Sequence, residues 1–264
     1  MISGKTIAIT MTRGHAESVA DMVTKAGGIP YIIPTTELRA VDCGQGVSSL
    51  ASELYAGRID YVVFLSANAF THLARAADAM GIHILGALQR VPTVAIGSQT
   101  ARFLESNGLR VADVAGDYSS DGLVRLFERI GVSGRSIAVI RNASARDRLA
   151  VRLGSLGASR VIELCTYKTE ASVDDRAARA FAGSLRNGSI AAIVFGSGLE
   201  ASCLLSMLHV KPNSGQESRL FRGVRLAAIG KSTADRMSAI GLNADIVPDE
   251  HTFEALVRAL AARL

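Results

Sequence analysis

Two segments place a glycine and a hydroxyl residue where a helix is expected to begin. They are Gly97-Ser98-Gln99-Thr100 and Gly230-Lys231-Ser232-Thr233, and each follows a short apolar run. The first turn of a helix has free backbone N–H groups and a positive dipole end, so it can bind an anion. Hydroxyl side chains near a helix start also cap the helix without any ligand. The pattern predicts anion-binding turns or ordinary caps, and the sequence leaves both open.

The two segments belong to a longer internal repeat. Residues 94–109 return as residues 227–242, with seven of the sixteen positions identical. Further strand–helix units correspond in the same order, among them residues 64–67 and 195–198. Such recurrence at one spacing indicates a duplicated α/β module.

Apolar strands alternate with helices along the whole chain. Continuous apolar strands are typical of parallel sheets that helices cover on both faces, and each module has about five such strands. In these sheets ligands bind beyond the carboxyl ends of the strands. The loops that follow the strands are therefore the candidates for a site: residues 12–13, 66–68, 97–100, 141–146, 197–198 and 230–233.

Two glycine-containing segments resemble nucleotide-binding loops but lack parts of the motif. A phosphate loop needs a glycine five residues before Gly230, where Arg225 stands within an expected strand. Residues 196–201 fit a loose dinucleotide fingerprint, but the corresponding residues 65–70 lack the glycines. We therefore expect neither a nucleotide nor a nicotinamide or flavin cofactor.

Histidines and cysteines are the other residues that could hold a metal or act as nucleophiles. They are His15, His72, His83, His209 and His251, and Cys43, Cys165 and Cys203. The histidines lie far apart, no CxxC pair occurs, and no nucleophile elbow is present. We expect no metal and no cofactor, and free cysteines in a reduced cytoplasm.

Length and composition favour a two-domain protein. The chain has 264 residues, of which 48% are hydrophobic and 20% charged. Only five of its 29 basic residues are lysines, and arginine suits the binding of carboxylates. The arginines are scattered and aromatic residues are few, so we expect no nucleic-acid partner. No signal segment or membrane-spanning run is visible, which predicts a soluble cytoplasmic protein.

Four segments, in this order, resemble the uroporphyrinogen-III synthase family over nearly the whole chain. They are Ile7 with Thr12-Arg13, the FLSANA segment at residues 64–69, Arg141 and Arg146 with Tyr167, and residues 228–252. Two residues depart from the family pattern: Leu65 replaces a usual threonine, and Asn142 replaces a glycine.

The resemblance implies a two-lobed α/β fold. Each lobe is a parallel sheet of about five strands flanked by helices, and two crossing segments join the lobes. One lobe comprises residues 1–36 and 170–264, and the other residues 37–169. The crossings lie at about residues 34–38 and 165–169. The boundaries of the lobes then differ from the boundaries of the two repeated modules.

The resemblance also implies the reaction. The substrate is hydroxymethylbilane, a linear tetrapyrrole with an acetate and a propionate on every ring. It loses its hydroxyl group as water and closes, with inversion of ring D, to uroporphyrinogen III. The family uses no metal or cofactor, and we expect a monomer with no nucleic-acid or membrane partner.

The resemblance assigns the site residues by position. Tyr167 is a candidate acid or hydrogen-bond donor to the departing hydroxyl, and the alternative is a tyrosine that only packs between the lobes. The expected substrate-binding residues are Arg13, Ser66, Asn68, Gly97, Thr100, Arg141, Arg146, Ser197, Gly198, Gly230, Lys231 and Thr233. The alternative function is a non-enzymatic, two-lobed sensor or binder of small anions, because no cluster of His, Cys or carboxylate residues stands out.

Overall fold

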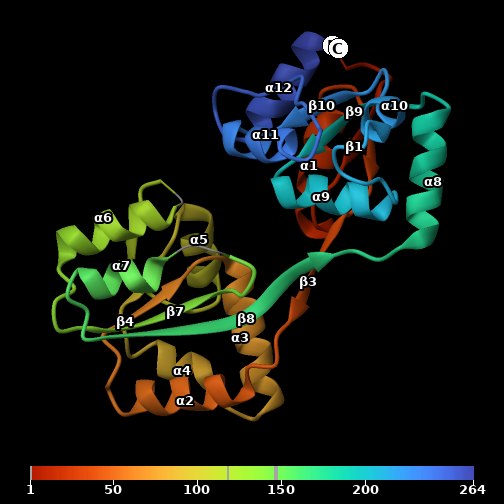
Figure 1. Cartoon of the computed structure of the whole chain (residues 1–264). Coiled ribbons are helices and arrows are strands. Elements are labelled where there is room, and N and C mark those ends of the chain that lie inside the picture. Colours follow the sequence, from red (N-terminus) through yellow and green to blue (C-terminus); the bar gives the residue numbers. More distant parts are fainter. Residues whose placement is uncertain (1, 118, 146–147) are drawn as a thin grey trace. The chain divides into compact units, whose positions relative to one another are not determined.

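The computed structural model describes residues 2–117, 119–145 and 148–264 (Figure 1). The chain divides into two compact units, which we call unit 1 (Met1–Leu38 and Glu170–Leu264) and unit 2 (Arg39–Thr169). It leaves unit 1 along β3 (Thr36–Ala40) and returns along β8 (Arg160–Ala171). Unit 1 is therefore built from both ends of the chain.

The sheet of unit 1 has the strand order β10-β9-β1-β2. The strands are β1 (Thr6–Ile9), β2 (Ile29–Ile32), β9 (Ile190–Phe195) and β10 (Arg225–Ala228). All neighbours are parallel, with Ile9 opposite both Ile32 and Val194. A parallel bridge between Ala227 and Ile246 extends the sheet beyond β10. Because the central strands are buried on both faces, helices must cover both.

Helices cover the two faces of this sheet in separate groups. The helices α1 (Arg13–Lys25) and α12 (Phe253–Arg263) bury Val19 and Leu256 against Ile7 and Val194. The other face carries α8 (Asp175–Arg186), α9 (Gly198–Met207), α10 (Gln216–Leu220) and α11 (Lys231–Ser238). The connection through α1 runs from β1 to β2, and the connection through α9 runs the opposite way across the sheet, so right-handed crossovers place them on opposite faces.

The sheet of unit 2 has the order β3-β8-β7-β4-β5-β6. Its further strands are β4 (Tyr61–Phe64), β5 (Thr93–Ala95), β6 (Val111–Val114) and β7 (Ser136–Asn142). From β8 to β6 all neighbours are parallel. The order β8-β7-β4-β5 repeats the order β2-β1-β9-β10 of unit 1. The predicted fold class is confirmed, with an edge strand, β3, added to unit 2.

The helices of unit 2 also form two groups. On one face α6 (Ser120–Ile130) and α7 (Leu149–Ser155) bury Phe127 and Leu153 against Val63 and Val139. The second group comprises α2 (Gly44–Tyr55), α3 (Ala67–Ala79), α4 (Ile84–Leu88) and α5 (Ser98–Ser106), with α3 in contact with the other three. The right-handed rule puts this group on the opposite face. None of the helices in the described chain combines the length and apolar character that crossing a bilayer requires.

Candidate functional site

Each sheet has one position where adjacent strands lead to helices on opposite faces. In unit 1 it lies between β1, which leads to α1, and β9, which leads to α9. In unit 2 it lies between β7, which leads to α7, and β4, which leads to α3. At such a switch point the two loops diverge and leave a crevice at the carboxyl edge of the sheet. The residues at these points are Arg13, Ser197 and Gly198 at the starts of α1 and α9 in unit 1, and Ser66, Asn68 and Arg141 at the start of α3 and the end of β7 in unit 2.

A polar cluster surrounds Tyr167 at the switch point of unit 2. The Tyr167 Oη lies 2.9 Å from Ser66 Oγ, and the tyrosine is only 5% exposed. The His72 imidazole stacks on its ring, with centroids 5.2 Å apart and planes 14° apart. Burial raises the pKa of Tyr167, and hydrogen bonds from Ser66 and Asn142 oppose that rise. The phenol is therefore a neutral donor at physiological pH.

The loop after β7 is bonded to β8 beside this tyrosine. Asn142 Nδ2 donates to Thr169 Oγ1 at 2.9 Å, and Asn142 Oδ1 accepts the Ser144 N–H at 2.8 Å. Ser144 Oγ donates to the Thr169 carbonyl at 3.0 Å and accepts the Thr169 N–H at 3.0 Å. Asn142, one of the two departures from the family pattern, thus supplies side-chain bonds that a glycine could not form.

Arg141 is buried under the same loop. It is 5% exposed, and its guanidinium pairs with Glu163 and donates to the Ala145 carbonyl at 3.1 Å. A buried guanidinium needs such partners, since removing them leaves an uncompensated charge. The geometry favours a role for Arg141 in holding the loop, and direct contact with a substrate stays a prediction. Arg146 lies outside the described residues.

The remaining predicted residues of unit 2 lie in the first turns of α3 and α5. Ser66 is the N-cap of α3 and accepts the Ala69 N–H at 3.1 Å, and Asn68 is half-buried in the first turn. Gly97 is the N-cap of α5, and no side chain caps this helix. Thr100 is therefore not the cap that the sequence allowed.

The second glycine–threonine turn, in unit 1, has the same construction. Gly230 is the N-cap of α11, no side chain among the described residues caps that helix, and Thr233 is buried in its first turn. A Cβ at Gly230 would lie 2.6 Å from Cδ2 of His251, so the exposed imidazole would have to shift to admit it. Lys231 and Arg13 are exposed at the first positions of α11 and α1.

Ser197 and Gly198 start α9 at the switch point of unit 1. Ser197 is the N-cap, and its Oγ accepts the Glu200 N–H at 3.3 Å. A Cβ at Gly198 would lie 2.4 Å from Cβ of Arg236, so α9 and α11 can approach only with glycine there. The Glu200 carboxyl group lies beneath this turn, buried among polar groups.

Sequence reasoning missed Glu200 and His72. Glu200 completes the Ser-x-x-Glu capping box with Ser197, and that spacing was a usable signal. His72 had no such signal, because only the packing of α3 against β8 brings it onto Tyr167. Within the described ranges no three His, Cys, Asp or Glu side chains are grouped to hold a metal ion.

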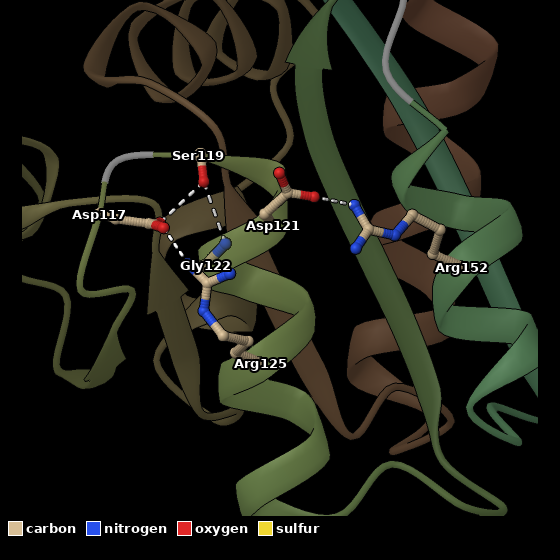
Figure 2. A network of polar contacts seen from close by, with 6 residues as sticks. All are labelled: Asp117, Ser119, Asp121, Gly122, Arg125 and Arg152. Carbon is tan, nitrogen blue, oxygen red and sulfur yellow. Dashed lines mark hydrogen bonds and ion pairs between the residues drawn. The ribbon is translucent and has the colours of Figure 1, made fainter.

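One helix N-terminus in unit 2 already holds an anion of its own (Figure 2). Ser119 caps α6 through the Gly122 N–H, and its Oγ donates to Asp117 at 2.8 Å. Arg125 pairs with Asp117, and a Cβ at Gly122 would lie 1.8 Å from the Asp117 Oδ1. Because Asp117 fills this N-terminus, α6 is not a candidate for binding a substrate carboxylate.

One cavity lies away from the switch points. Its volume is about 430 Å³, and residues at the amino end of β10 and the end of α11 line it, among them Arg225, Gly241 and Asp245. This is the amino edge of the sheet of unit 1. In parallel α/β sheets ligands bind at the other edge, so cavity size alone does not mark the site.

Comparison with known proteins identifies the family. Residues 17–258 match the family described as uroporphyrinogen-III synthase HemD. The chain belongs to the uroporphyrinogen-III synthase family. It is 27% identical to a protein of Methanothermobacter thermautotrophicus named "Putative uroporphyrinogen-III synthase", over 98% of both chains. It is 22% identical to the uroporphyrinogen-III synthase of Chlorobaculum parvum, over 98% of this chain and 99% of the relative.

A solved structure of the family has the same fold. A mutant uroporphyrinogen III synthase from the extremely thermophilic bacterium Thermus thermophilus superimposes with a TM-score of 0.64, covering 98% of this chain and 99% of that one. The two sequences are 20% identical, so the match supports the fold and carries no residue roles. Membership of this family implies lyase chemistry in tetrapyrrole biosynthesis.

Proposed function

We propose that this protein is a uroporphyrinogen-III synthase. It converts hydroxymethylbilane to uroporphyrinogen III and water, with inversion of ring D. The observation that carries the proposal is the family match over residues 17–258. The two switch points support it, because each combines polar side chains with a helix N-terminus at the carboxyl edge of a sheet.

The reaction requires the protein mainly to hold the reacting carbons in the correct geometry. The hydroxymethyl C–O bond breaks, the hydroxyl leaves with a proton as water, and the methylene carbon becomes electrophilic. The substituted carbon of ring D then attacks that methylene and forms a spiro intermediate. The older bond from this carbon to the methylene of ring C breaks and re-forms at the free α carbon of ring D, whose proton is lost and balances the one that left as water. Holding the reacting carbons together can supply about 7–11 kcal/mol in favourable cases. Without such control the chain closes uninverted, to the type I isomer.

Tyr167 is the proposed proton or hydrogen-bond donor to the departing hydroxyl. Either oxygen of the Ser66–Tyr167 contact can be the donor. When Ser66 donates to the phenol oxygen, the phenol hydrogen is available to the substrate. Because burial raises the pKa of Tyr167, the hydrogen stays on the phenol until a leaving group takes it. The alternative, a tyrosine with a packing role only, is tested by the Tyr167→Phe variant.

The substrate carboxylates are proposed to bind at the first turns of α5 and α11 and at the exposed cations. The backbone N–H groups at Gly97–Thr100 and Gly230–Thr233, with Lys231 and Arg13, are the main candidates. Each charge-assisted hydrogen bond contributes about 1.5–3 kcal/mol. Since each ring carries two carboxylates, several such contacts together can hold the substrate in one orientation.

The isomer ratio of the product tests the proposed function. Freshly prepared hydroxymethylbilane is incubated with the protein, the products are oxidised to porphyrins, and the isomers are separated by chromatography. We expect the type III isomer in excess over a protein-free control. Type I alone, at the rate of the control, would refute the activity and favour a binding protein. We further propose that the protein is cytoplasmic and monomeric. Sedimentation of the purified protein would check the monomeric state.

A further inference from the structure

Asn142 is the last residue of β7 and lies beside Tyr167 on β8. The two strands are parallel neighbours, with Asn142 opposite Tyr167. Their register shifts between Arg141 and Asn142, so β8 has one extra residue at this point. Such an irregularity re-aims side chains next to a site. The Ala143 N–H donates to the Tyr167 carbonyl at 2.8 Å, which holds the end of β7 against the tyrosine.

The orientation of the Asn142 amide follows from its neighbours. Its Oδ1 accepts the Ser144 N–H at 2.8 Å, and its Nδ2 donates to Thr169 Oγ1 at 2.9 Å. Exchanging the oxygen and the nitrogen would turn the NH₂ group towards a backbone N–H, so that two donors would face each other. The NH₂ group must therefore point towards β8.

The second hydrogen of this NH₂ group is directed at the phenol. Side-chain hydrogen bonds join the Tyr167 oxygen to Ser66 and to Asn142. The NH₂ group has two hydrogens and no free lone pair, so it can only donate, to Thr169 with one hydrogen and to Tyr167 with the other. Asn142 thus occupies one acceptor position of the phenol oxygen and cannot receive the phenol hydrogen.

Ser66 can fill the other acceptor position of the phenol oxygen. Its Oγ lies 2.9 Å from Tyr167 Oη, and it accepts the Ala69 N–H at 3.1 Å while keeping one hydrogen to give. When the serine donates this hydrogen, the phenol oxygen accepts from Ser66 and Asn142 together. The phenol hydrogen then lies outside the network, and a group in front of the phenol can receive it.

The surroundings make these two contacts decisive for the direction of the phenol hydrogen. Tyr167 is 5% exposed, and the His72 imidazole covers a face of its ring with the planes 14° apart. Water competes little for hydrogen bonds at a buried group, where such bonds are stronger than in water. The neighbours of the phenol oxygen, rather than solvent, therefore set where its hydrogen points.

We propose that Asn142 is a positioning residue for Tyr167: its amide donates to the phenol oxygen, cannot accept the phenol hydrogen, and so leaves that hydrogen to the departing hydroxyl. The inference rests on the proposed function, because the hydroxyl of hydroxymethylbilane is the group concerned. Asn142 acts through Tyr167 and is not itself the donor to the substrate. Its hydrogen bond also strengthens as the phenol oxygen becomes negative, which favours transfer of the proton.

The variant Asn142→Asp turns the donor into an acceptor of almost the same shape. A carboxylate still accepts the Ser144 N–H, and the Thr169 hydroxyl can donate its own hydrogen to the other oxygen. The bonds that hold the loop to β8 are kept, but the carboxylate now binds the phenol hydrogen. We expect kcat for type III formation to fall by about 10²-fold or more, towards the value of Tyr167→Phe.

The variant Asn142→Ala removes the amide and leaves the phenol hydrogen free. Loss of one neutral hydrogen bond to the phenol should lower kcat by only about twofold to tenfold. The bonds to Ser144 and Thr169 are lost as well, so urea unfolding should show this variant to be less stable than Asn142→Asp. A structural role for Asn142 predicts that activity follows stability, whereas the positioning role predicts the opposite order. An Asn142→Asp variant at least as active as Asn142→Ala would overturn the proposal.

The control for the added negative charge is Ala143→Asp. Ala143 is exposed next to Asn142, and its methyl group makes no hydrogen bond that the change could remove. The extra charge repels the substrate carboxylates, so we expect KM to rise while kcat stays close to that of the wild type. A fall in kcat as large as that of Asn142→Asp would show that charge alone is responsible, and would overturn the role of the amide.

Infrared spectroscopy tests the hydrogen bond without any substrate. The C–O stretching band of a tyrosine shifts with the hydrogen bonds that its hydroxyl donates and accepts. Subtracting the spectrum of Tyr167→Phe isolates the band of Tyr167. We expect this band to shift in Asn142→Asp and in Asn142→Ala, and to stay in place in Ala143→Asp. An unchanged band in Asn142→Asp would refute the contact on which the inference depends.

The outcomes separate this inference from the proposed function. A wild-type protein that yields only type I refutes the proposed function, and the inference fails with it. Full turnover in Tyr167→Phe overturns the inference, because the reaction then needs no phenol hydrogen. An active wild type with an impaired Tyr167→Phe variant, in which Asn142→Asp matches or exceeds Asn142→Ala, overturns the role of Asn142 alone.

Discussion

Replacing Tyr167 by phenylalanine removes one oxygen and leaves the packing of the ring unchanged. The stacking on His72 and the burial of the ring persist, while the contact of 2.9 Å with Ser66 is lost. Ser66 keeps its bond to the Ala69 N–H, and the side-chain bond between Asn142 and the phenol is lost as well. Loss of two such bonds costs about 1–3 kcal/mol of stability.

The effect on turnover should be much larger if the phenol donates to the leaving hydroxyl. General acid catalysis contributes about 10²–10⁴-fold, which corresponds to roughly 2.7–5.4 kcal/mol of barrier. We therefore expect kcat for type III formation to fall by that factor in Tyr167→Phe, with KM changed far less. The assay is steady-state formation of the type III isomer over a range of substrate concentrations, alongside urea unfolding of the same preparation.

A matched control separates the hydroxyl from the general effect of losing a tyrosine. Tyr61 lies in unit 2, on β4, with its ring edge-on to Phe127 at 5.7 Å between centroids. Tyr61→Phe should keep both stability and kcat. If Tyr167→Phe retains full turnover, the tyrosine only packs, and the donor to the leaving group must be sought elsewhere.

Two further predictions concern stability. The guanidinium groups of Arg58, first, and Arg160 lower the pKa of Glu53 from 4.5 to about 2. The ionised form of Glu53 therefore stabilises the fold above pH 4.5. This stabilisation is lost as the pH falls towards 2. Urea unfolding should show wild type approaching Glu53→Gln over that range, and a constant difference would contradict the assignment. Gly198→Ala should destabilise by about 1–3 kcal/mol, because its Cβ would lie 2.4 Å from that of Arg236. Gly183→Ala, in the open middle of α8, should instead stabilise by about 0.5–1 kcal/mol, and equal effects of the two changes would refute the packing argument.

The strands at the centre of each sheet were predictable from sequence. The segments that form β4 and β9 are short, continuous and apolar, and burial on both faces demands that composition. The internal repeat also indicated that these two segments form equivalent strands, because residues 64–67 correspond to residues 195–198. The turns after β5 and β10 followed from glycine at a strand end. That neither threonine acts as a cap became clear only from the position of the N-cap.

Other elements depend on contacts between distant residues. The strand β3, with the sequence TELRA, is half-exposed and has no apolar pattern, and it forms because β8 supplies a partner. The contact between Thr10 and Glu200 joins residues 190 positions apart, and the stacking of His72 on Tyr167 joins residues on α3 and β8. No local spacing encodes such pairs, so the environment of the site came from the structure.

The division of unit 1 between the two ends of the chain has a consequence for synthesis on the ribosome. All residues of unit 2 emerge in one stretch, so its sheet can be completed while the rest of the chain is still being made. The strands β1 and β2 emerge first, yet β9, which pairs with β1, follows only after about 160 further residues. At about 5–20 residues per second the wait is roughly 8–30 s. During that time the apolar edge of β1 is exposed, and we expect this nascent segment, rather than unit 2, to need a chaperone.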